Sequence, residues 1–209
     1  MDTESEVTET APQRRTQQER REGTRKRLLD AAVEELIQTG YVRFRTAEVC
    51  RRAELSQGAL FKHFATKTEL VGATARHLFS LLIADYENLF AAAAKHQDPI
   101  GASLRLLWQT FNGPLPKAAV ELLAAARTDP ELATTLSPVI AEHRTNLRNS
   151  ARALFPDLAK RPNFDAHVRM LHDAMHGAIL WTLVTPDATA DDMVSYLSHL
   201  TRVVATRDL

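Results

Sequence analysis

Apolar residues recur every three to four positions along most of this chain of 209 residues, which is the spacing of an amphipathic α-helix. A stripe that begins at Leu28 runs to Ile37, and Gly40 follows as a residue that commonly ends a helix. Further helices are expected over 46–53, 57–64, 67–96, 130–154, 164–184 and 189–205, and from Pro99 and Pro114 onward. No strand pattern stands out, so the spacing predicts an all-α fold of about nine helices.

Several residues mark where these helices begin or bend. Ser56 and Thr66 stand directly before two of the helices and are expected to cap them with their hydroxyl oxygens. Pro99 and Pro114 fit the first turn of a helix, where the missing N–H is not needed. Pro138 lies inside an expected helix and predicts a kink or a break there.

The composition is that of an ordinary globular protein, with 44% hydrophobic and 25% charged residues. A single cysteine, Cys50, excludes an internal disulfide and agrees with a reducing compartment. Because Cys50 is next to core positions, we expect a buried, unreactive thiol rather than a redox switch. No apolar run reaches the ~18 residues of a membrane span. The polar start of the chain does not fit a signal peptide. We therefore expect a cytoplasmic protein with no membrane partner.

The net charge is zero, but the charges are unevenly distributed. Residues 1–13 contain four acids and no base, with almost nothing to bury, and are expected to be disordered. Residues 14–76 carry 14 Lys or Arg against 8 Asp or Glu. One basic segment in a neutral protein indicates either contact with a polyanion or a solvated surface. The run from Arg14 to Arg27 leaves both interpretations open.

The stretch from Thr46 to Phe64 predicts two short helices joined by the tight turn Glu54-Leu55-Ser56. This is the arrangement of a helix-turn-helix, whose second helix enters the major groove of DNA. The residues expected to form its small core are Val49, Ala53, Leu55, Leu60 and Phe64.

Residues 24–84 resemble the TetR family of bacterial regulators. The matching motifs are Leu28-Leu29-Asp30-Ala31-Ala32, Gly40-Tyr41, Ser56-x-Gly58-x-Leu60-Phe61-x-His63-Phe64 and Lys67-x-x-Leu70. The resemblance implies a three-helix DNA-binding domain, a long connecting helix, and a divergent helical domain that dimerises and often binds a small effector. We place a disordered tail and basic arm at 1–20, the DNA-binding domain at 21–84, and the effector-binding and dimerisation domain at 85–209.

The expected partner is double-stranded DNA with a near-palindromic operator, because a two-fold dimer requires two related half-sites. The residues expected to contact DNA are Arg45, Thr46, Ser56, Gln57, Gly58, Ala59, Phe61, Lys62, His63 and Lys67. Three positions depart from the family pattern. Glu54 replaces a common Gly at a left-handed turn, and Phe61 replaces the usual Tyr. Arg45 replaces an N-cap Ser or Thr, so Thr46 is expected to cap one residue later.

The C-terminal half carries more large apolar side chains than a minimal bundle needs, together with a few histidines. An apolar cavity with sparse polar groups is the usual site for a small molecule, so we expect a mostly apolar or aromatic effector. The residues expected to line its site are Phe79, Leu82, Tyr86, Trp108, Phe111, His143, Leu147, His172, Met175 and His176. The alternative is that these side chains simply pack as core.

The expected helix over 164–184 has apolar residues on two sides, which indicates two packing partners, and the last helix adds one apolar stripe. We expect them to pair with their copies as a four-helix bundle in a homodimer. The residues assigned to this interface are Met170, Ala174, Gly177, Ala178, Trp181, Leu197 and Leu200.

The leading hypothesis is a ligand-responsive repressor, and two other functions were weighed. An architectural DNA binder would use the same fold without an effector. A helical enzyme could use His172, Asp173 and His176, but no nucleophile–base set, phosphate loop or cofactor motif accompanies them. His172 and His176, with His143 and His167 nearby in principle, could also bind a metal, but no recognisable ligand spacing completes the site. We therefore expect no enzyme activity, no cofactor and no metal.

Overall fold

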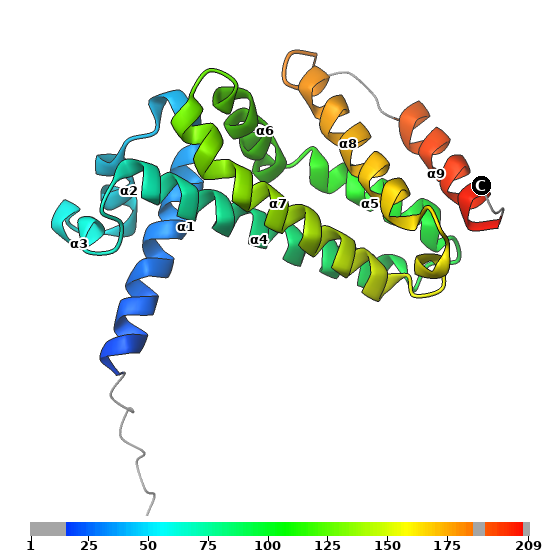
Figure 1. Cartoon of the computed structure of the whole chain (residues 1–209), viewed down its shortest axis with the longest axis horizontal. Coiled ribbons are helices and arrows are strands. Elements are labelled where there is room, and N and C mark those ends of the chain that lie inside the picture. The colour runs from blue at the N-terminus through cyan, green and yellow to red at the C-terminus, as the bar shows by residue number, and fades with distance from the viewer. Residues whose placement is uncertain (1–15, 186–190, 207–209) are drawn as a thin grey trace, which may run out of the picture.

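The computed structural model describes residues 16–185 and 191–206, and every regular element within them is a helix (Figure 1). The α-helices are α1 (Gln17–Arg43), α2 (Thr46–Ala53), α3 (Gln57–Phe61), α4 (Lys67–Ala93), α5 (Pro99–Phe111), α6 (Pro114–Ala126), α7 (Pro130–Leu154), α8 (Phe164–Thr182) and α9 (Asp191–Thr206). A short 3-10 helix, η1 (Leu158–Lys160), connects α7 to α8. The expectation of an all-α fold is confirmed over this part of the chain.

Helix α1 is anchored at both ends by side chains. At its start, Thr16 accepts a hydrogen bond from the Glu19 N–H, and the Glu19 carboxylate accepts one from the Thr16 N–H. Near its end, Gly40 has φ 72° and interrupts the helix, as the sequence predicts, before one more turn to Arg43. The positive φ at Gly40 favours glycine, and a Cβ there would also displace the Glu121 carboxylate of α6.

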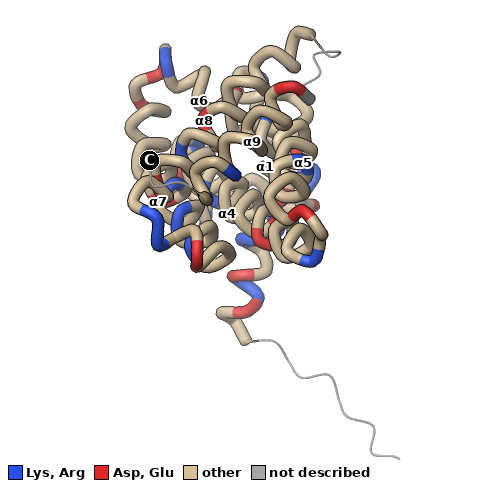
Figure 2. The backbone as a smooth tube through the Cα atoms, turned by 90° about the vertical axis from the view of Figure 1, so that its right-hand side faces the viewer, with Lys and Arg blue, Asp and Glu red and all other residues tan. Residues whose placement is uncertain are grey.

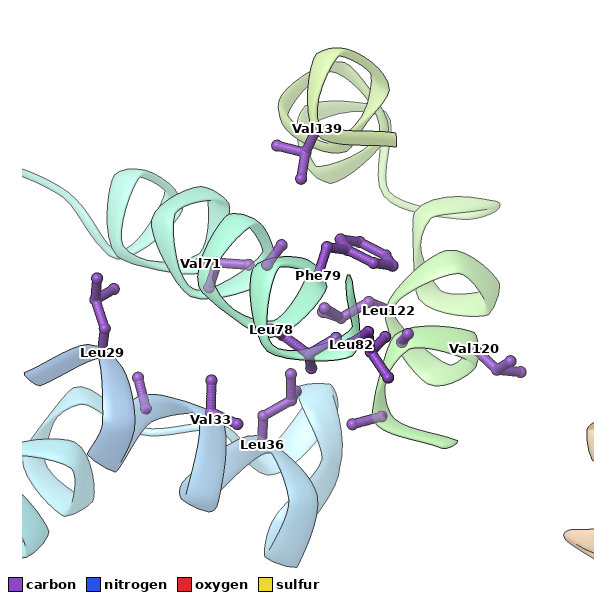
Figure 3. Close-up of a cluster of buried hydrophobic side chains, with 14 of the residues drawn as sticks. Leu29, Val33, Leu36, Val71, Leu78, Phe79, Leu82, Val120, Leu122 and Val139 are labelled. Carbon is purple, nitrogen blue, oxygen red and sulfur yellow. The ribbon is translucent and has the colours of Figure 1, made fainter. Parts of the chain in front are cut away.

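Helix α4 lies at the centre of the molecule and packs against α1, α5, α6 and α7. Figure 3 shows the side chains of Leu29, Val33 and Leu36 pointing from α1 toward α4. On α4, Leu78 and Leu82 are almost completely buried, and Phe79 is buried as well. This helix therefore forms one continuous core with the N-terminal helices at one end and the C-terminal helices at the other.

The remaining helices cover the distal half of α4. Helix α5 packs on α4, α9 packs on α5, and α8 contacts α5, α6 and α7. Helix α7 continues through Pro138, so the predicted break does not occur. Pro138 is exposed, so water can bind the carbonyl that its missing N–H leaves without a partner.

Several helix ends differ from the predicted boundaries. Helix α3 ends at Phe61 rather than at residue 64, α4 ends at Ala93, and α8 ends at Thr182. At the N-terminus, residues 17–20 of the expected basic arm belong to α1. The expectation of disorder over residues 1–13 lies outside the described residues. These differences concern the ends of helices, where side-chain packing and capping decide the boundary.

Candidate DNA-binding surface and effector cavity

Helices α2 and α3 form the expected helix-turn-helix. The hydroxyl of Ser56 caps α3 by accepting a hydrogen bond from the Ala59 N–H at 3.1 Å, as predicted. Leu60 and Phe64 are almost fully buried, which fixes α3 against the rest of the domain. Glu54 adopts the left-handed conformation, with φ 52° and ψ 46°, so this departure from the family glycine places a strained residue in the turn.

A buried ion pair that the sequence analysis missed joins α1 to α2. The Glu35 side chain is 1% exposed and accepts a hydrogen bond from Arg52 Nε at 2.9 Å. Arg52 also donates to the Gln38 side chain at 2.6 Å, and Thr39 donates to the Glu35 carboxylate. A signal was present in the sequence, because Glu35 stands seven residues after Leu28 on the apolar stripe of α1.

Most of the residues assigned to DNA contact lie at the surface of the helix-turn-helix. The exposed ones are Arg45, Ser56, Gln57, Gly58, Phe61, Lys62 and Lys67. Thr46, Ala59 and His63 are half-buried. The expectation that Thr46 caps α2 is wrong, because Arg45 occupies the N-cap position and no side chain accepts a hydrogen bond there.

The basic start of α1 lies beside the recognition helix. The guanidinium of Arg25 lies 5.3 Å from the centre of the Phe64 ring. Burial, together with the charges of Arg21 and Arg25, lowers the pKa of His63. These contacts place the positive charges of Arg21 and Arg25 close to His63 and Phe64, in the segment just after α3.

Lys67, at the first position of α4, lies close to two aromatic rings. Its ammonium is 5.8 Å from the centre of the Tyr41 ring and 6.0 Å from that of Phe44. The Tyr41 hydroxyl donates to the Asp129 carboxylate at 2.9 Å, and burial together with this bond raises the pKa of Tyr41 to about 12. Lys67 thus stands where the DNA-binding domain meets the start of α7.

A cavity of about 90 Å³ lies in the distal half of the molecule. Its lining comes from α4, α5, α7, η1, α8 and α9 and is almost entirely apolar. The lining residues are Tyr86, Phe90, Ile100, Ser103, Leu104, Leu107, Phe111, Leu147, Ala151, Phe155, Leu158, Arg161, Phe164, His167, Val168, Leu171, His172, Thr201, Val204 and Ala205.

Four of the ten residues assigned to the effector site line this cavity: Tyr86, Phe111, Leu147 and His172. The other six do not line it: Phe79, Leu82, Trp108, His143, Met175 and His176. Several of these lie behind its wall, because Phe79 packs against His143, and His176 packs against Phe111, at ring distances of 4.5 and 4.9 Å. Most of the lining residues that the sequence did not predict belong to α5 or lie between Phe155 and Leu171. Whether these residues reach the cavity depends on how the helices cross.

Three histidines form a buried cluster at one side of the cavity. The rings of His143 and His172 are 5.6 Å apart, and those of His172 and His176 are 4.1 Å apart. Burial lowers the pKa of all three, to about 4 for His143 and about 2 for His172. The cluster is therefore uncharged at neutral pH. Within residues 16–185 and 191–206, no three His, Cys, Asp or Glu side chains are arranged to hold a metal ion.

Polar atoms in the cavity wall lack hydrogen-bond partners. These atoms are Tyr86 Oη, Ser103 Oγ and His172 Nε2, all buried in residues that line the cavity. His143 also has two ring nitrogens without a partner. A buried polar group without a partner is costly, so this wall is suited to a ligand that supplies donors and acceptors.

The residues assigned to the dimer interface divide into two groups. Trp181 and Met170 are exposed apolar side chains, and a Cβ at Gly177 would meet open space, so no described part of the protomer covers this face of α8. Ala174, Ala178 and Leu200 are half-buried. Leu197 is only 5% exposed and packs in the hydrophobic core of the protomer, so it can add little contact area to such an interface.

Cys50 is buried as expected, and burial raises the pKa of its thiol, which makes it a poor nucleophile. Among the described helices, none has both the length and the apolar character needed to cross a bilayer.

Family models match both halves of the chain. Residues 28–74 match the bacterial regulatory proteins of the tetR family, and residues 95–206 match the tetracyclin repressor-like C-terminal domain. An uncharacterised HTH-type transcriptional regulator of Mycobacterium tuberculosis (strain H37Rv) is 32% identical over 180 residues, covering 85% of this chain and 92% of that protein. The HTH-type transcriptional regulator CymR of Pseudomonas putida is 32% identical over 134 residues, covering 64% of this chain and 66% of CymR.

Solved structures share the same architecture. The multidrug binding protein EbrR complexed with imidazole superposes with a TM-score of 0.63 at 25% identity, covering 87% of this chain and 89% of EbrR. A TetR-family transcriptional regulator from Rhodococcus sp. has a TM-score of 0.69 at 16% identity, covering 88% of this chain and all of that one. The second likeness concerns the fold alone.

Proposed function

This chain belongs to the TetR family of DNA-binding transcription regulators, and we propose that it is a homodimeric repressor that a small, mostly apolar molecule releases from a near-palindromic operator. The observation that carries the proposal is one helix, α4, that joins the two sites. Lys67 at its first position adjoins the DNA-binding domain, and Tyr86 and Phe90 near its other end line the cavity. Over 27 residues this helix spans about 40 Å.

Polar contacts also join the DNA-binding domain to the helices around the cavity. Tyr41 donates its backbone N–H to Glu121 of α6 at 2.9 Å and its hydroxyl to Asp129 at 2.9 Å. Thr68 of α4 donates to Glu131 of α7 at 2.7 Å. A ligand that repositions α4 or α7 therefore changes the placement of α3. A ligand with about 3 kcal/mol higher affinity for the form that cannot bind DNA would reduce operator occupancy about a hundredfold.

The effector role draws support from the cavity and from one relative. The cavity is lined by six elements, and its mostly apolar wall includes a few polar residues, which is the usual composition of a small-molecule site. EbrR, which is similar to this chain over most of its length, is described as a multidrug binding protein in complex with imidazole. We infer that the corresponding region of this chain also takes a small organic ligand.

The decisive experiment combines operator selection with filling of the cavity. The purified protein should select a near-palindromic DNA sequence from a random pool, and an apolar ligand found by thermal shift should release that DNA in a gel-shift assay. Val168→Trp places a large ring in the cavity wall and should abolish the ligand response. Leu123→Trp, at a half-exposed site on α6, is the matched control. Sequence-independent binding would instead favour an architectural role.

The proposed dimer is tested separately. Gly177 is exposed between the apolar side chains of α8, and two copies of this face would bury them together. Gly177→Arg should place bulk and charge in that contact and give a monomer in sedimentation velocity. Gly23→Arg, on the exposed first half of α1, should remain a dimer. A dimeric Gly177→Arg variant would place the interface elsewhere.

A further inference from the structure

A second pocket lies between α7 and α8, and basic side chains surround it. Its volume is about 230 Å³, and Arg144, Arg148 and Arg169 line it together with one acidic residue, Asp165. Figure 2 shows Lys and Arg positions gathered beside α7 on the side of the molecule that it faces. The lining of this pocket is more polar than that of the apolar cavity, so it is better suited to a charged ligand.

The charges in this pocket do not cancel. Asp165 accepts a hydrogen bond from Arg152 Nε at 2.9 Å, and this bond lowers the pKa of the Asp165 carboxyl. Arg148 makes one weak hydrogen bond, to the Thr145 hydroxyl at 3.3 Å. Arg144 lies close enough to the histidine cluster for its charge to contribute to the lowered pKa of His172. Three guanidinium groups thus face a pocket whose single carboxylate already has a partner.

The arginine pocket and the apolar cavity share a wall. Leu147, Val168 and His172 line both. Away from Arg161, the cavity disfavours a charged group, because burial of an unpaired charge among apolar side chains is very costly. The arginine pocket can hold an anion in water, and a guanidinium matches the two oxygens of a carboxylate. One molecule with an apolar part and an acidic head would therefore satisfy both spaces if the shared wall opens.

We propose that the effector is an amphipathic organic acid, whose carboxylate binds Arg144 and Arg169 while its apolar part passes between Leu147 and Val168 into the cavity. This inference rests on the proposed ligand-responsive function and specifies its ligand. Tyr86 and Ser103 line the inner space and their buried hydroxyl oxygens have no partner, so a weakly polar substituent on the apolar part can also be bound there if these side chains turn toward it. The small cavity requires that the side chains of the shared wall shift when the ligand enters.

A different arginine could bind the carboxylate of the effector instead of Arg144 and Arg169. Arg161 also lines the apolar cavity, at the side closed by α9. Its guanidinium already donates to the Ala205 carbonyl at 3.1 Å and so contributes to holding η1 against α9. The rival position predicts that Arg161, and not Arg144 and Arg169, determines the preference for an acid.

Matched acids and amides test the proposal on the full chain. Octanoate and 4-phenylbutanoate are compared with octanamide and 4-phenylbutanamide by isothermal titration calorimetry. Each acid should bind at least tenfold more tightly than its amide. The double variant Arg144→Gln/Arg169→Gln should weaken acid binding about tenfold, and amide binding serves as the internal measure of a folded cavity. Arg127→Gln, an exposed arginine at the end of α6, is the control for loss of one positive charge.

The outcomes separate this inference from the function on which it rests. If amides bind as tightly as acids and release operator DNA, the cavity is an effector site but the acid preference is wrong. If Arg161→Gln removes the acid preference and the double variant retains it, the assigned carboxylate position is wrong. If no acid or amide binds, the effector role of the cavity fails, and the inference fails with it.

Discussion

The two ends of α4 are built differently. At the DNA end, Glu35, Arg52 and Gln38 satisfy one another by hydrogen bonds of 2.6 and 2.9 Å. At the other end, all the described buried side-chain atoms without a hydrogen-bond partner are gathered, on Tyr86, Ser103, His143 and His172. At the DNA end the buried polar groups are paired within a well-packed core. The other end contains a cavity.

This difference corresponds to what each end has to do. A recognition helix has to hold its side chains in fixed register against DNA, so a fully paired interior is an advantage. A ligand site has to gain stability when the ligand arrives, so polar atoms left without partners are acceptable there. Stability is therefore expected to respond to different perturbations at the two ends.

The largest expected effect is at the DNA end. Arg52→Leu leaves the Glu35 carboxylate buried without its partner and should lower the free energy of unfolding by about 3–5 kcal/mol in urea denaturation. Arg51→Leu is the matched control, because the ion pair between Arg51 and Glu48 is exposed. Its loss should lower the free energy of unfolding by less than about 1 kcal/mol. The double variant Glu35→Leu/Arg52→Leu should recover most of the loss. Equal effects at positions 51 and 52 would contradict the assigned role of the buried pair.

The next largest expected effect is a pH dependence of protein stability that arises at the cavity end. The pKa of His143 is about 4 in the folded protein and about 6.5 when unfolded, so the unfolded state binds more protons between these values. The stabilisation is complete above pH 6.5 and is lost as the pH falls, by about 1.4 kcal/mol per pH unit for this histidine. His143→Leu should therefore lose less stability than the wild type between pH 7 and pH 5. The variant His199→Leu, at an exposed position, is the control, and identical pH profiles for all three proteins would exclude His143 as the cause.

The sequence predicted the DNA end better than the cavity end, for a physical reason. Caps and turns act locally, so Ser56 and Thr66 could be assigned from their neighbours in sequence, and both accept the expected hydrogen bonds. The helical spacing of apolar residues also predicted the all-α fold, and Leu60 and Phe64 are buried as expected. What local signals missed was the partner of Glu35, since Arg52 is 17 residues away.

The cavity depends on how separate helices cross, which periodicity does not specify. Helix α5 shows the problem: Trp108 and Leu107 are neighbours on its apolar side, yet only Leu107 lines the cavity. Likewise, Met175 is completely buried and still does not face the open space. An apolar stripe thus predicts burial, but it does not distinguish a residue that packs from one that lines a pocket.

A smaller change at the DNA end should raise the stability of the protein, whereas Arg52→Leu should lower it. Glu54 is held at φ 52°, where glycine has no Cβ penalty, so Glu54→Gly should stabilise the protein by about 1 kcal/mol. Glu48→Gly, inside the helix α2 that Glu54 follows, should destabilise the protein by about 1 kcal/mol, because glycine disfavours helical backbone. Thermal unfolding of the two variants should give melting temperatures on opposite sides of the wild type. A destabilised Glu54→Gly variant would mean that the carboxylate makes a contribution larger than the backbone strain.

The smallest expected effect concerns DNA affinity and leaves stability alone. Lys62 is exposed at the end of α3, where a lysine can neutralise a backbone phosphate. Lys62→Ala should reduce the slope of log affinity against log salt by about 0.9 for each protomer, with a similar loss on every DNA sequence. Lys95→Ala, exposed beyond the far end of α4, should leave the slope unchanged. Gel-shift titrations at several salt concentrations measure both. If the two lysines behave alike, the charge on α3 acts only through the overall field, and the phosphate contact assigned to Lys62 is wrong.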